Sequence, residues 1–377
     1  MSERRPVVVL LGGPSAEHDV SIVSGSAVAA ALGRTGHPVE QVLIDLEGRW
    51  WPLPESPAGA AGDLPDLVPA DFDDPAGLGA EGPRSSGAIL EGLAARDPRP
   101  VVFIALHGPF GEDGTVQALL EAADLAYTGS GVAASALGMD KALFKRLVRG
   151  LGLPVVDWRE VGARRWSADP GGVLAELEAF AAGTGDPRLI VKPARLGSSV
   201  GMTLAHGPLE RAAALAAAFE HDTLALVERY VVDARELEVA VLGNDPARLE
   251  LYGPGEILPG HEFYDYAAKY TPGLSETSPT AEIDAHLRAT LLKIARDAYR
   301  AIGAEGFARL DFLVESGTPY LSEINTIPGF TPISLFPAMA AAGGYDFGAL
   351  AGRIVELGHE RWTARVRRRL VPGDLPR

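Results

Sequence analysis

Short apolar runs alternate with alanine-rich stretches over the first third of the chain. The run from Val7 to Leu11 is continuous and ends in two glycines, and such runs are typical of parallel strands that are buried on both faces. Further strands are expected at residues 39–46 and 101–105, with helical stretches between them, and Ser15 is expected to cap the first helix. This alternation predicts a doubly wound α/β domain.

The pattern between residues 140 and 230 is less regular and predicts an α+β fold. Residues 52–86 are rich in Pro, Gly, Ala and Asp without a clear period, which predicts a long and partly mobile insertion. A second loop is expected at 255–280, and a terminal helix near the end of the chain. The remaining helices are expected at 132–137, 141–151, around 173–182 and at 283–302, and the remaining strands at 125–127, 155–161, 189–193, 202–205, 224–229 and 237–242.

Two strands near the C-terminus hold the densest group of candidate functional residues. The segments FARLDFLV (307–314) and YLSEIN (320–325) are joined by turn-forming residues, so together they predict a β-hairpin. Alternation by two places Arg309 and Asp311 on one face of the first strand. The opposite face of this strand is apolar and is expected to lie in the core.

On the second strand the same alternation groups Glu323 with Asn325, so three oxygen-bearing side chains are expected to converge beside an arginine. Oxygen ligands suit Mg²⁺ or Mn²⁺, and neighbouring carboxylates repel each other unless a proton or a cation lies between them. The alternative is a solvated polar face on an edge hairpin. The stiff turn at 326–331, directly after these side chains, favours a metal site with a substrate wall attached.

The composition limits the classes of function. The 377 residues are 47% hydrophobic and 22% charged, which is ordinary for a soluble enzyme of two or three domains. The lack of cysteine excludes disulfides, thiolate metal sites and a cysteine nucleophile. The net charge of −16 argues against binding to nucleic acids or anionic membranes, and no apolar stretch is long enough for a signal peptide or a membrane span. We therefore expect a cytoplasmic protein, and the arginines between residues 361 and 369 are expected on a solvated helix end.

Lysine is rare in this chain: five of the 34 basic residues are lysine, at positions 141, 145, 192, 269 and 293. Because arginine is used so freely, lysine is expected where a compact ammonium is required. Lys192 ends the expected strand at 189–193, and the loop of small residues after it, at 194–201, offers backbone amides to phosphate oxygens. The alternative for this loop is a plain surface turn.

Two loops near the N-terminus are expected to face one crevice. The loop at 107–114 follows the third strand at its carboxyl end, where open α/β sheets bind ligands, and Glu17 and His18 occupy the matching position after the first strand. His107 is either a structural residue or a site residue. Asp113 either belongs to the site or caps the next helix.

A third loop, at 263–270, is unusually aromatic for a chain with 7% aromatic residues. It predicts a lid able to fold over a site, and the alternative is local packing of an exposed loop. Glu228 at the end of one strand and Glu236 at the start of the next are candidates for hydrogen bonds to an adenine and a ribose. Each of these glutamates is alternatively a surface residue.

Taken in order, these segments resemble the ATP-grasp superfamily and, within it, the D-alanine–D-alanine ligases. The resemblance rests on GGPSAEHDVS, HGPFGEDG, YTGSGVAASALGMDK, VKPARLGSSVGM, FYDYAAKY and EINTIPGFTPIS, and covers nearly the whole chain apart from residues 52–86 and the last residues. It implies a Rossmann-like N-terminal domain followed by a two-part ATP-grasp fold. The implied domains are 1–139, 140–230 and 231–377.

The resemblance also implies the groups that bind ATP and metal. The residues implied for the nucleotide are Lys141, Lys192, Ser199, Glu228, Glu236 and Lys269. The residues implied as ligands of two Mg²⁺ (or Mn²⁺) ions are Asp311, Glu323 and Asn325.

A further set is implied to act on the substrates. Arg309 and the backbone of Gly329 match the groups that stabilise a tetrahedral oxyanion. Glu17, which matches the group that holds the first ammonium, would join Ser198 and Tyr270 in a hydrogen-bonded triad that closes the lid. His107 matches a residue beside the first D-alanine, and Ser334 matches the group that takes the second substrate's carboxylate.

The implied reaction joins two D-alanines for peptidoglycan precursor synthesis. ATP phosphorylates the first carboxylate, the amine of the second amino acid attacks the resulting acyl phosphate, and ADP and phosphate are released. Metals and lysines neutralise charge on the phosphoryl group, Arg309 meets the developing oxyanion, and a closed lid keeps water out. The implied partners are small molecules and a second copy of the chain, with no nucleic acid and no membrane.

Two other readings remain open. A D-alanine–D-lactate ligase resembles this chain but lacks the lysine–tyrosine pair in the lid, so Lys269 and Tyr270 favour an amine as the second nucleophile. A catalytically silent ATP-grasp domain would act as a sensor or scaffold, but it need not keep the metal-site residues and Arg309. The sequence leaves open whether the enzyme serves general wall synthesis or antibiotic self-resistance.

Overall fold

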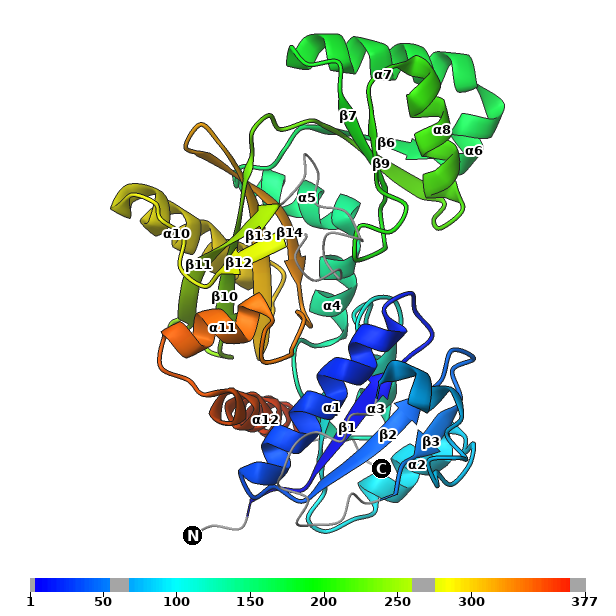
Figure 1. Cartoon of the computed structure of the whole chain (residues 1–377), viewed down its shortest axis with the longest axis vertical. Coiled ribbons are helices and arrows are strands. Elements are labelled where there is room, and N and C mark those ends of the chain that lie inside the picture. Colours follow the sequence, from blue (N-terminus) through cyan, green and yellow to red (C-terminus); the bar gives the residue numbers. More distant parts are fainter. Residues whose placement is uncertain (1–3, 55–67, 260–274, 367–377) are drawn as a thin grey trace, which may run out of the picture.

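The computed structural model describes residues 4–54, 68–259 and 275–366, which form three β-sheets with helices packed around them (Figure 1). Each sheet comes from one continuous part of the sequence, and we name them the N-terminal, middle and C-terminal sheets. In Figure 1 the N-terminal sheet lies at the bottom, the middle sheet at the top, and the C-terminal sheet to the left between them. None of the helices in these ranges has the length and hydrophobicity that crossing a membrane requires.

The N-terminal sheet has the strand order β3-β2-β1-β4-β5 and is parallel except for β3. Its strands are β1 (Val7–Gly12), β2 (Val39–Ile44), β3 (Trp50–Pro52), β4 (Val101–Ile104) and β5 (Ala126–Tyr127), and its helices are α1 (His18–Arg34), α2 (Ser86–Ala94) and α3 (Thr115–Ala122). Every residue of β1 and β4 is buried, which confirms the doubly wound domain predicted from continuous apolar runs. Because the strand order reverses between β1 and β4, the loops that follow these two strands meet at one edge of the sheet.

Ser15 does not cap the first helix, so this prediction is wrong. Helix α1 begins at His18, and Ser15 lies in the turn before it. The Ser15 hydroxyl donates to the carbonyl of His107 at 2.8 Å and accepts from the amide of Glu17 at 3.1 Å. The hydroxyl therefore ties the two loops at the edge of the sheet together instead of capping the helix.

Part of the 52–86 stretch is regular and anchored. The short 3₁₀-helix η1 (Pro69–Asp73) buries Phe72 in the N-terminal core, and Trp50 forms a β-bridge with Arg84. The segment η1 is therefore an ordered part of the stretch predicted to be a long and partly mobile insertion. Residues 55–67 of this stretch lie outside the described residues.

The last helix, α12 (Phe347–Val366), packs against α1 and β5, so the C-terminal part of the chain returns to the N-terminal sheet (Figure 1). The guanidinium of Arg361 lies 4.0 Å from the centre of the Tyr127 ring and donates to the Tyr127 carbonyl at 3.2 Å. The prediction of a solvated helix end is wrong for Arg361, since stacking on an aromatic ring buries it. Residues 367–369 lie outside the described residues.

The middle sheet is antiparallel and has the strand order β6-β9-β7-β8. Its strands are β6 (Trp158–Gly162), β7 (Leu189–Pro193), β8 (Thr203–Ala205) and β9 (Leu224–Arg229), and its helices are α6 (Ala163–Ala168), α7 (Pro170–Thr184) and α8 (Pro208–Phe219). Side chains of the sheet, α7 and α8 form a separate apolar core. Helices α4 (Val132–Met139) and α5 (Lys141–Gly150) precede the sheet, and Asp140 caps α5 by accepting from the amide of Leu143 at 2.9 Å.

Strand β6 begins at Trp158, three residues later than the sequence pattern predicts. Val155 instead forms a parallel bridge with Leu321, whose amide donates to the carbonyl of Pro154 at 2.9 Å. The predicted strand therefore joined two extended pieces that belong to different sheets. The first of these pieces connects the middle part of the chain to the C-terminal hairpin.

The C-terminal sheet is antiparallel and has the strand order β12-β11-β10-β13-β14. Its strands are β10 (Arg235–Leu242), β11 (Glu250–Pro259), β12 (Ser275–Ser278), β13 (Phe307–Glu315) and β14 (Thr318–Asn325), and its helices are α10 (Ala285–Ala301) and α11 (Leu335–Ala342). Apolar side chains of β10 and β13 pack against α10. Residues 308, 310, 312 and 314 are at most 3% exposed, so the predicted core face of β13 is confirmed.

The prediction of a loop over residues 255–280 is wrong at both ends, where the chain forms β11 and β12. Gly253 and Gly255 interrupt the apolar pattern of β11, and the register between β10 and β11 shifts at this point. A bulge accommodates glycines inside a strand, whereas in the sequence they resemble a break between elements.

Candidate active site

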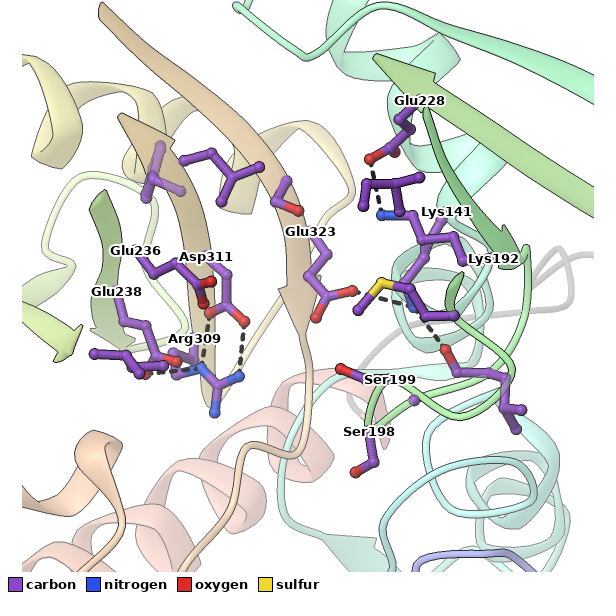
Figure 2. A pocket seen from close by; sticks show the side chains of 18 of the residues that line it. Lys141, Lys192, Ser198, Ser199, Glu228, Glu236, Glu238, Arg309, Asp311 and Glu323 are labelled. Carbon is purple, nitrogen blue, oxygen red and sulfur yellow. Dashed lines mark hydrogen bonds and ion pairs between the residues drawn. The ribbon is translucent and has the colours of Figure 1, made fainter. Parts of the chain in front are cut away.

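A pocket lies between the middle and C-terminal sheets (Figure 2). It is lined by the loop after β7, by the facing ends of β9 and β10, and by the polar face of the β13–β14 hairpin. Its charged lining residues are Lys141, Lys192, Arg309, Glu228, Glu236, Glu238, Asp311 and Glu323. Carboxylates outnumber cations five to three in this lining, so its net charge is negative.

The hairpin brings its four predicted polar side chains onto one face. In the register of β13 and β14, Arg309 lies opposite Asn325. Asp311 lies opposite Glu323 in the same register. Nε and Nη2 of Arg309 each donate to Asp311 at 2.7 Å, and Nδ2 of Asn325 donates to Asp311 Oδ2 at 2.9 Å. The juxtaposition predicted from strand alternation is confirmed.

Arg309 is held between carboxylates of two strands. Its Nε also lies 3.1 Å from Oε2 of Glu238 on β10. Burial alone would lower the pKa of Arg309, but Asp311 and Glu238 outweigh burial and raise this pKa well above its ordinary value. The guanidinium is therefore a fixed positive charge on the wall of the pocket.

Lys141, the first residue of α5, links three parts of the pocket. Its Nζ donates to the carbonyl of Leu196 in the loop after β7 at 2.8 Å and lies 3.1 Å from Oε2 of Glu323 (Figure 2). Burial would lower the pKa of Lys141, but the Glu323 carboxylate outweighs this effect and raises it. The ammonium of Lys141 therefore stays charged, and it lies between the loop after β7 and the β13–β14 hairpin.

Glu17 joins the N-terminal loops to the loop after β7. Its Oε1 accepts a hydrogen bond from the Ser198 hydroxyl. A Cβ added at Gly108 would lie 2.7 Å from Glu17 Oε2, and one added at Gly197 would lie 2.5 Å from the same oxygen. A side chain at either position would therefore push the Glu17 carboxylate out of its place.

The loop after β7 has an unusual backbone. Ser198 and Ser199 have φ angles of 51° and 57°, in the left-handed region that residues with a side chain rarely adopt. Such strain persists where the surrounding structure holds it, and it is concentrated at functional sites. Residues 196–200 of this loop also line the pocket, which a plain surface turn, the alternative interpretation, does not explain.

His107 is buried behind the pocket and does not line it. Its Nδ1 lies 3.0 Å from the carbonyl oxygen of Ile327, and its Nε2 lies 3.0 Å from Oγ of Ser24. Since a carbonyl only accepts, Nδ1 carries the proton and Nε2 accepts from the serine. Burial lowers the pKa of His107, so the ring is a neutral bridge that orients the turn after β14.

Glu112 and Asp113 have separate structural roles in the 107–114 loop. Oε1 of Glu112 accepts from the amide of Gly108 at 2.9 Å, and Oε2 accepts from the amide of Ile327 at 3.4 Å. Burial, reinforced by the charge of Glu17, raises the pKa of Glu112 to about 8. Asp113 accepts from the amides of Phe110 and Thr115, each at 2.9 Å, so it stabilises the loop before α3, whose N-cap residue is Gly114. Glu112 is not among the residues predicted from the sequence, where its only signal is its place in a glycine-rich loop.

Glu228 lies at the end of β9 with an ammonium group on either side. Its Oε2 is 3.0 Å from Nζ of Lys192, and its Oε1 is 2.8 Å from Nζ of Lys145. Burial would raise the pKa of Glu228, but the two lysines outweigh it and lower the value to about 2. The sequence analysis gave Lys145 no role, although its position four residues after Lys141 places both lysines on one face of α5.

The turn after β14 brings Gly329 close to Ser334 at the start of α11. Oγ of Ser334 accepts from the amide of Thr331 at 3.1 Å and lies 2.8 Å from its hydroxyl. A Cβ added at Gly329 would lie 3.4 Å from the same oxygen. Of the other predicted site residues, Ser199 and Glu236 line the pocket, whereas Lys269 and Tyr270 lie outside the described residues.

The oxygen-bearing side chains of the hairpin fit a hard divalent cation. Among the described residues, no group of three or more His, Cys, Asp or Glu side chains is arranged to hold a metal ion. The candidate set instead combines two carboxylates, Asp311 and Glu323, with the amide of Asn325, and oxygen donors of this kind suit Mg²⁺ or Mn²⁺. In the structure, Arg309 pairs with Asp311 and Lys141 pairs with Glu323.

Two family models match the chain in succession. The model described as "D-ala D-ala ligase N-terminus" matches residues 6–130, and the one described as "D-ala D-ala ligase C-terminus" matches residues 147–356. Among similar proteins, a D-alanine–D-alanine ligase of Kineococcus radiotolerans is 41% identical, over 96% of this chain and 99% of that protein. Another from Heliobacterium modesticaldum is 40% identical, over 99% of both proteins.

Solved structures give the same picture in three dimensions. The D-alanine–D-alanine ligase of Coxiella burnetii aligns with a TM-score of 0.80 at 30% identity, covering 97% of both chains. The VanG D-Ala:D-Ser ligase of Enterococcus faecalis aligns with a TM-score of 0.77, also at 30% identity, covering 94% of this chain and 99% of that one. These similarities extend over the pocket and over all three sheets.

Proposed function

The chain belongs to the D-alanine–D-alanine ligase family of ATP-grasp enzymes, and from this premise we propose how its own residues perform the reaction. It is an ATP-dependent ligase that joins two D-alanines through an acyl phosphate and releases ADP and phosphate, for peptidoglycan precursor synthesis. The carboxylate and amide face of the hairpin carries the assignment. It lies across the pocket from Lys141 and Lys192, and phosphoryl transfer requires this combination of cations and metal ligands around one centre (Figure 2).

We propose that ATP lies between the middle and C-terminal sheets. Lys141 and Lys192 supply point charges to its phosphates, and the strained loop after β7 supplies Ser199 and backbone amides. Glu228 and Glu236, at the facing ends of β9 and β10, accept hydrogen bonds from the adenine and the ribose. Lys269, outside the described residues, is assigned to the same nucleotide by the family resemblance.

We propose that the first D-alanine binds beside Glu17, whose carboxylate takes the substrate ammonium. Ser198 fixes this carboxylate, and Gly108 and Gly197 leave room for it. Tyr270 completes the triad in this proposal. His107 acts on the site indirectly. Both of its ring nitrogens contact the protein, and it orients the carbonyl of Ile327.

The attack of the second amine places negative charge on the carbonyl oxygen of the first D-alanine. We propose that Arg309 and the backbone amide of Gly329 stabilise this oxyanion, because the guanidinium is permanently charged and its orientation is fixed before the reaction begins. Ser334, at the N-terminal end of α11, would take the carboxylate of the second substrate, where the helix dipole favours an anion.

We propose that Asp311, Glu323 and Asn325 hold two Mg²⁺ (or Mn²⁺) ions. When bound, the ions neutralise charge on the triphosphate and on the phosphoryl group in transfer. The residues fit this role because a lining with five carboxylates and three cations would repel a triphosphate unless positive charge is added. Asp311, Glu323 and Asn325 contribute the oxygen donors. The hydrogen bonds from Arg309 hold the carboxylate of Asp311 in place.

We also propose a division into domains 1–139, 140–230 and 231–377. Each of the three sheets falls within one of these ranges, although α12 of the last range packs on the N-terminal sheet. The family resemblance supports two further proposals, that the enzyme is a homodimer and that it works in the cytoplasm.

The identity of the second substrate is tested by measuring ADP release with D-alanine alone, with D-alanine plus D-lactate, and with D-alanine plus D-serine. Mass spectrometry of the products accompanies each assay. We expect full ADP release with D-alanine alone and D-alanyl-D-alanine as the main product of both mixtures. A depsipeptide or a serine-containing dipeptide as the main product at neutral pH would overturn the assignment. ATP binding without ADP release under any condition would indicate a silent scaffold.

A further inference from the structure

Helix α5 carries a second lysine that none of the roles above uses. The side chain of Lys145 is fully buried, lies one helical turn after Lys141 and does not line the pocket. An ammonium group is strongly hydrated in water, so burying it is costly unless an opposite charge compensates. The chain has only five lysines, which makes a buried one a feature that requires explanation.

The carboxylate of Glu228 compensates the charge of Lys145. Nζ of Lys145 lies 2.8 Å from Oε1 of Glu228 and 5.6 Å from the centre of the Trp158 ring. The contact is a close ion pair between two buried side chains. On the pocket side, Lys192 lies 3.0 Å from the other carboxylate oxygen (Figure 2). One ammonium therefore holds Glu228 from inside the protein and another from the site.

The two lysines differ in what else they serve. In the proposed function Lys192 also contacts the phosphates of the nucleotide, so its charge is shared when ATP is bound. Lys145 has no access to the nucleotide, and its charge stays committed to Glu228. Burial lowers the pKa of Lys145, and Glu228 is the carboxylate that opposes this effect.

We propose that Lys145 is a positioning residue that keeps Glu228 ionised and oriented, and that the pair thereby selects nucleotides with a 6-aminopurine over those with a 6-oxopurine. This inference rests on the proposed function, in which Glu228 contacts the adenine. An ionised carboxylate only accepts hydrogen bonds, so it pairs with a 6-amino group and opposes a 6-oxo group. A protonated carboxyl group donates as well and would tolerate the 6-oxo group.

The first test is Lys145→Met, which keeps an unbranched side chain and removes the charge. The control is Lys293→Met, because Lys293 lies on the exposed side of α10 and pairs with Asp297 at 2.7 Å. We measure kcat and KM with ATP, ITP and GTP. In Lys145→Met we expect KM for ATP to rise roughly ten- to a hundredfold, the loss expected for a hydrogen bond to a charged group, with a smaller change in kcat. The preference for ATP over ITP in kcat/KM falls by a similar factor, and Lys293→Met behaves as the wild type.

A pH profile separates this role from simple loss of packing. Among the residues that the structure describes, the charged groups acting on Glu228 are Lys145 on α5 and Lys192 on β7, with Arg149 of α5 also acting on Lys145. Without Lys145, burial is opposed by Lys192 alone, so Glu228 becomes protonated at a higher pH. The ratio of KM for ATP between Lys145→Met and the wild type is therefore expected to fall as pH rises from about 5 to about 8. A ratio that does not change with pH, together with an unchanged preference for ATP, would overturn the inference.

Glu228→Gln and the double variant distinguish this inference from the proposed function. If Glu228→Gln changes neither KM for ATP nor the purine preference, the adenine role of Glu228 is wrong. If Glu228→Gln changes both and Lys145→Met changes neither, only the role of Lys145 is wrong. We expect both single variants to lose purine preference, and Lys145→Met to add little in the Glu228→Gln background. Circular dichroism checks folding, and Lys145→Gln replaces Lys145→Met if the latter does not fold.

Discussion

Gly197→Ala should weaken binding of the first D-alanine without straining the backbone. Gly197 does not lie in the left-handed region, so alanine can adopt its conformation. The added Cβ would, however, lie 2.5 Å from Oε2 and 3.3 Å from Cδ of Glu17. The substitution therefore acts on one neighbour, the carboxylate proposed to take the substrate ammonium.

The size of the effect follows from this distance. Ordinary contacts of a Cβ begin near 3.4 Å, so the carboxylate or the loop must move by about 1 Å. A misplacement of this size at a substrate-positioning group costs about a hundredfold in rate, or about 2.7 kcal/mol of transition-state stabilisation. The same movement would disturb the hydrogen bond from Ser198 to Glu17.

The assay is steady-state ADP release at varied D-alanine, with a separate titration of ATP. We expect a large rise in KM for the first D-alanine, a fall in kcat/KM of about a hundredfold, and little change in KM for ATP. The control is Gly183→Ala in the last turn of α7, where an added Cβ meets nothing within 4 Å. That variant should keep wild-type kinetics and gain slightly in stability. Wild-type kinetics in Gly197→Ala would refute the proposed role of Glu17.

Three further predictions test the metal site, the buried acid and the core. Asp311→Asn and Glu323→Gln should each reduce ADP release far more than tenfold at saturating Mg²⁺ with native circular dichroism; near-normal turnover in both would contradict the metal assignment. Glu112→Gln should change the pH dependence of folding. Burial raises the pKa of Glu112 from 4.5 to about 8. Protonation of Glu112 therefore stabilises the folded state fully below pH 4.5 and progressively less up to pH 8. The difference in unfolding free energy between wild type and Glu112→Gln should therefore shrink across this interval, and a constant difference in urea titrations would count against the raised pKa. Leu310→Ala, at a fully buried position of β13, should cost about 2–5 kcal/mol of stability by denaturant unfolding, and a cost under 1 kcal/mol would show that this face is not core.

The hairpin was predictable because its information is local. A strand has a side-chain period of two, so the sequence alone places Arg309 and Asp311 on one face and the apolar residues on the other. From the turn, the register pairs Phe312 with Leu321, and a bulge between Asp311 and Phe312 then puts Asp311 opposite Glu323. The pattern therefore grouped the polar residues within each strand, whereas the bulge that brings the two pairs onto one face was not visible in it.

The predictions failed where a contact from a distant segment decides the local structure. Gly253 and Gly255 resemble a break, and only pairing with β10 turns them into a bulge inside β11. Ser15 has the side chain of a helix cap, but its hydroxyl donates to the carbonyl of His107, 92 residues away. In both cases the local preference was real and a tertiary hydrogen bond was stronger.

Buried ionisable residues are the part of the site that sequence patterns describe least. Lys145 and Glu112 both look like ordinary surface residues in the sequence, since charged side chains are rarely buried unless they are paired. Their partners, Glu228 and the amides of Gly108 and Ile327, come from other strands and loops. The local signal is the four-residue spacing of Lys141 and Lys145, which places both side chains on one face of α5. This spacing does not show that Lys141 faces the pocket and Lys145 the interior. The orientation of each lysine depends on where α5 packs. It decides that Lys141 is placed to contact the substrate, whereas Lys145 acts through its neighbour Glu228.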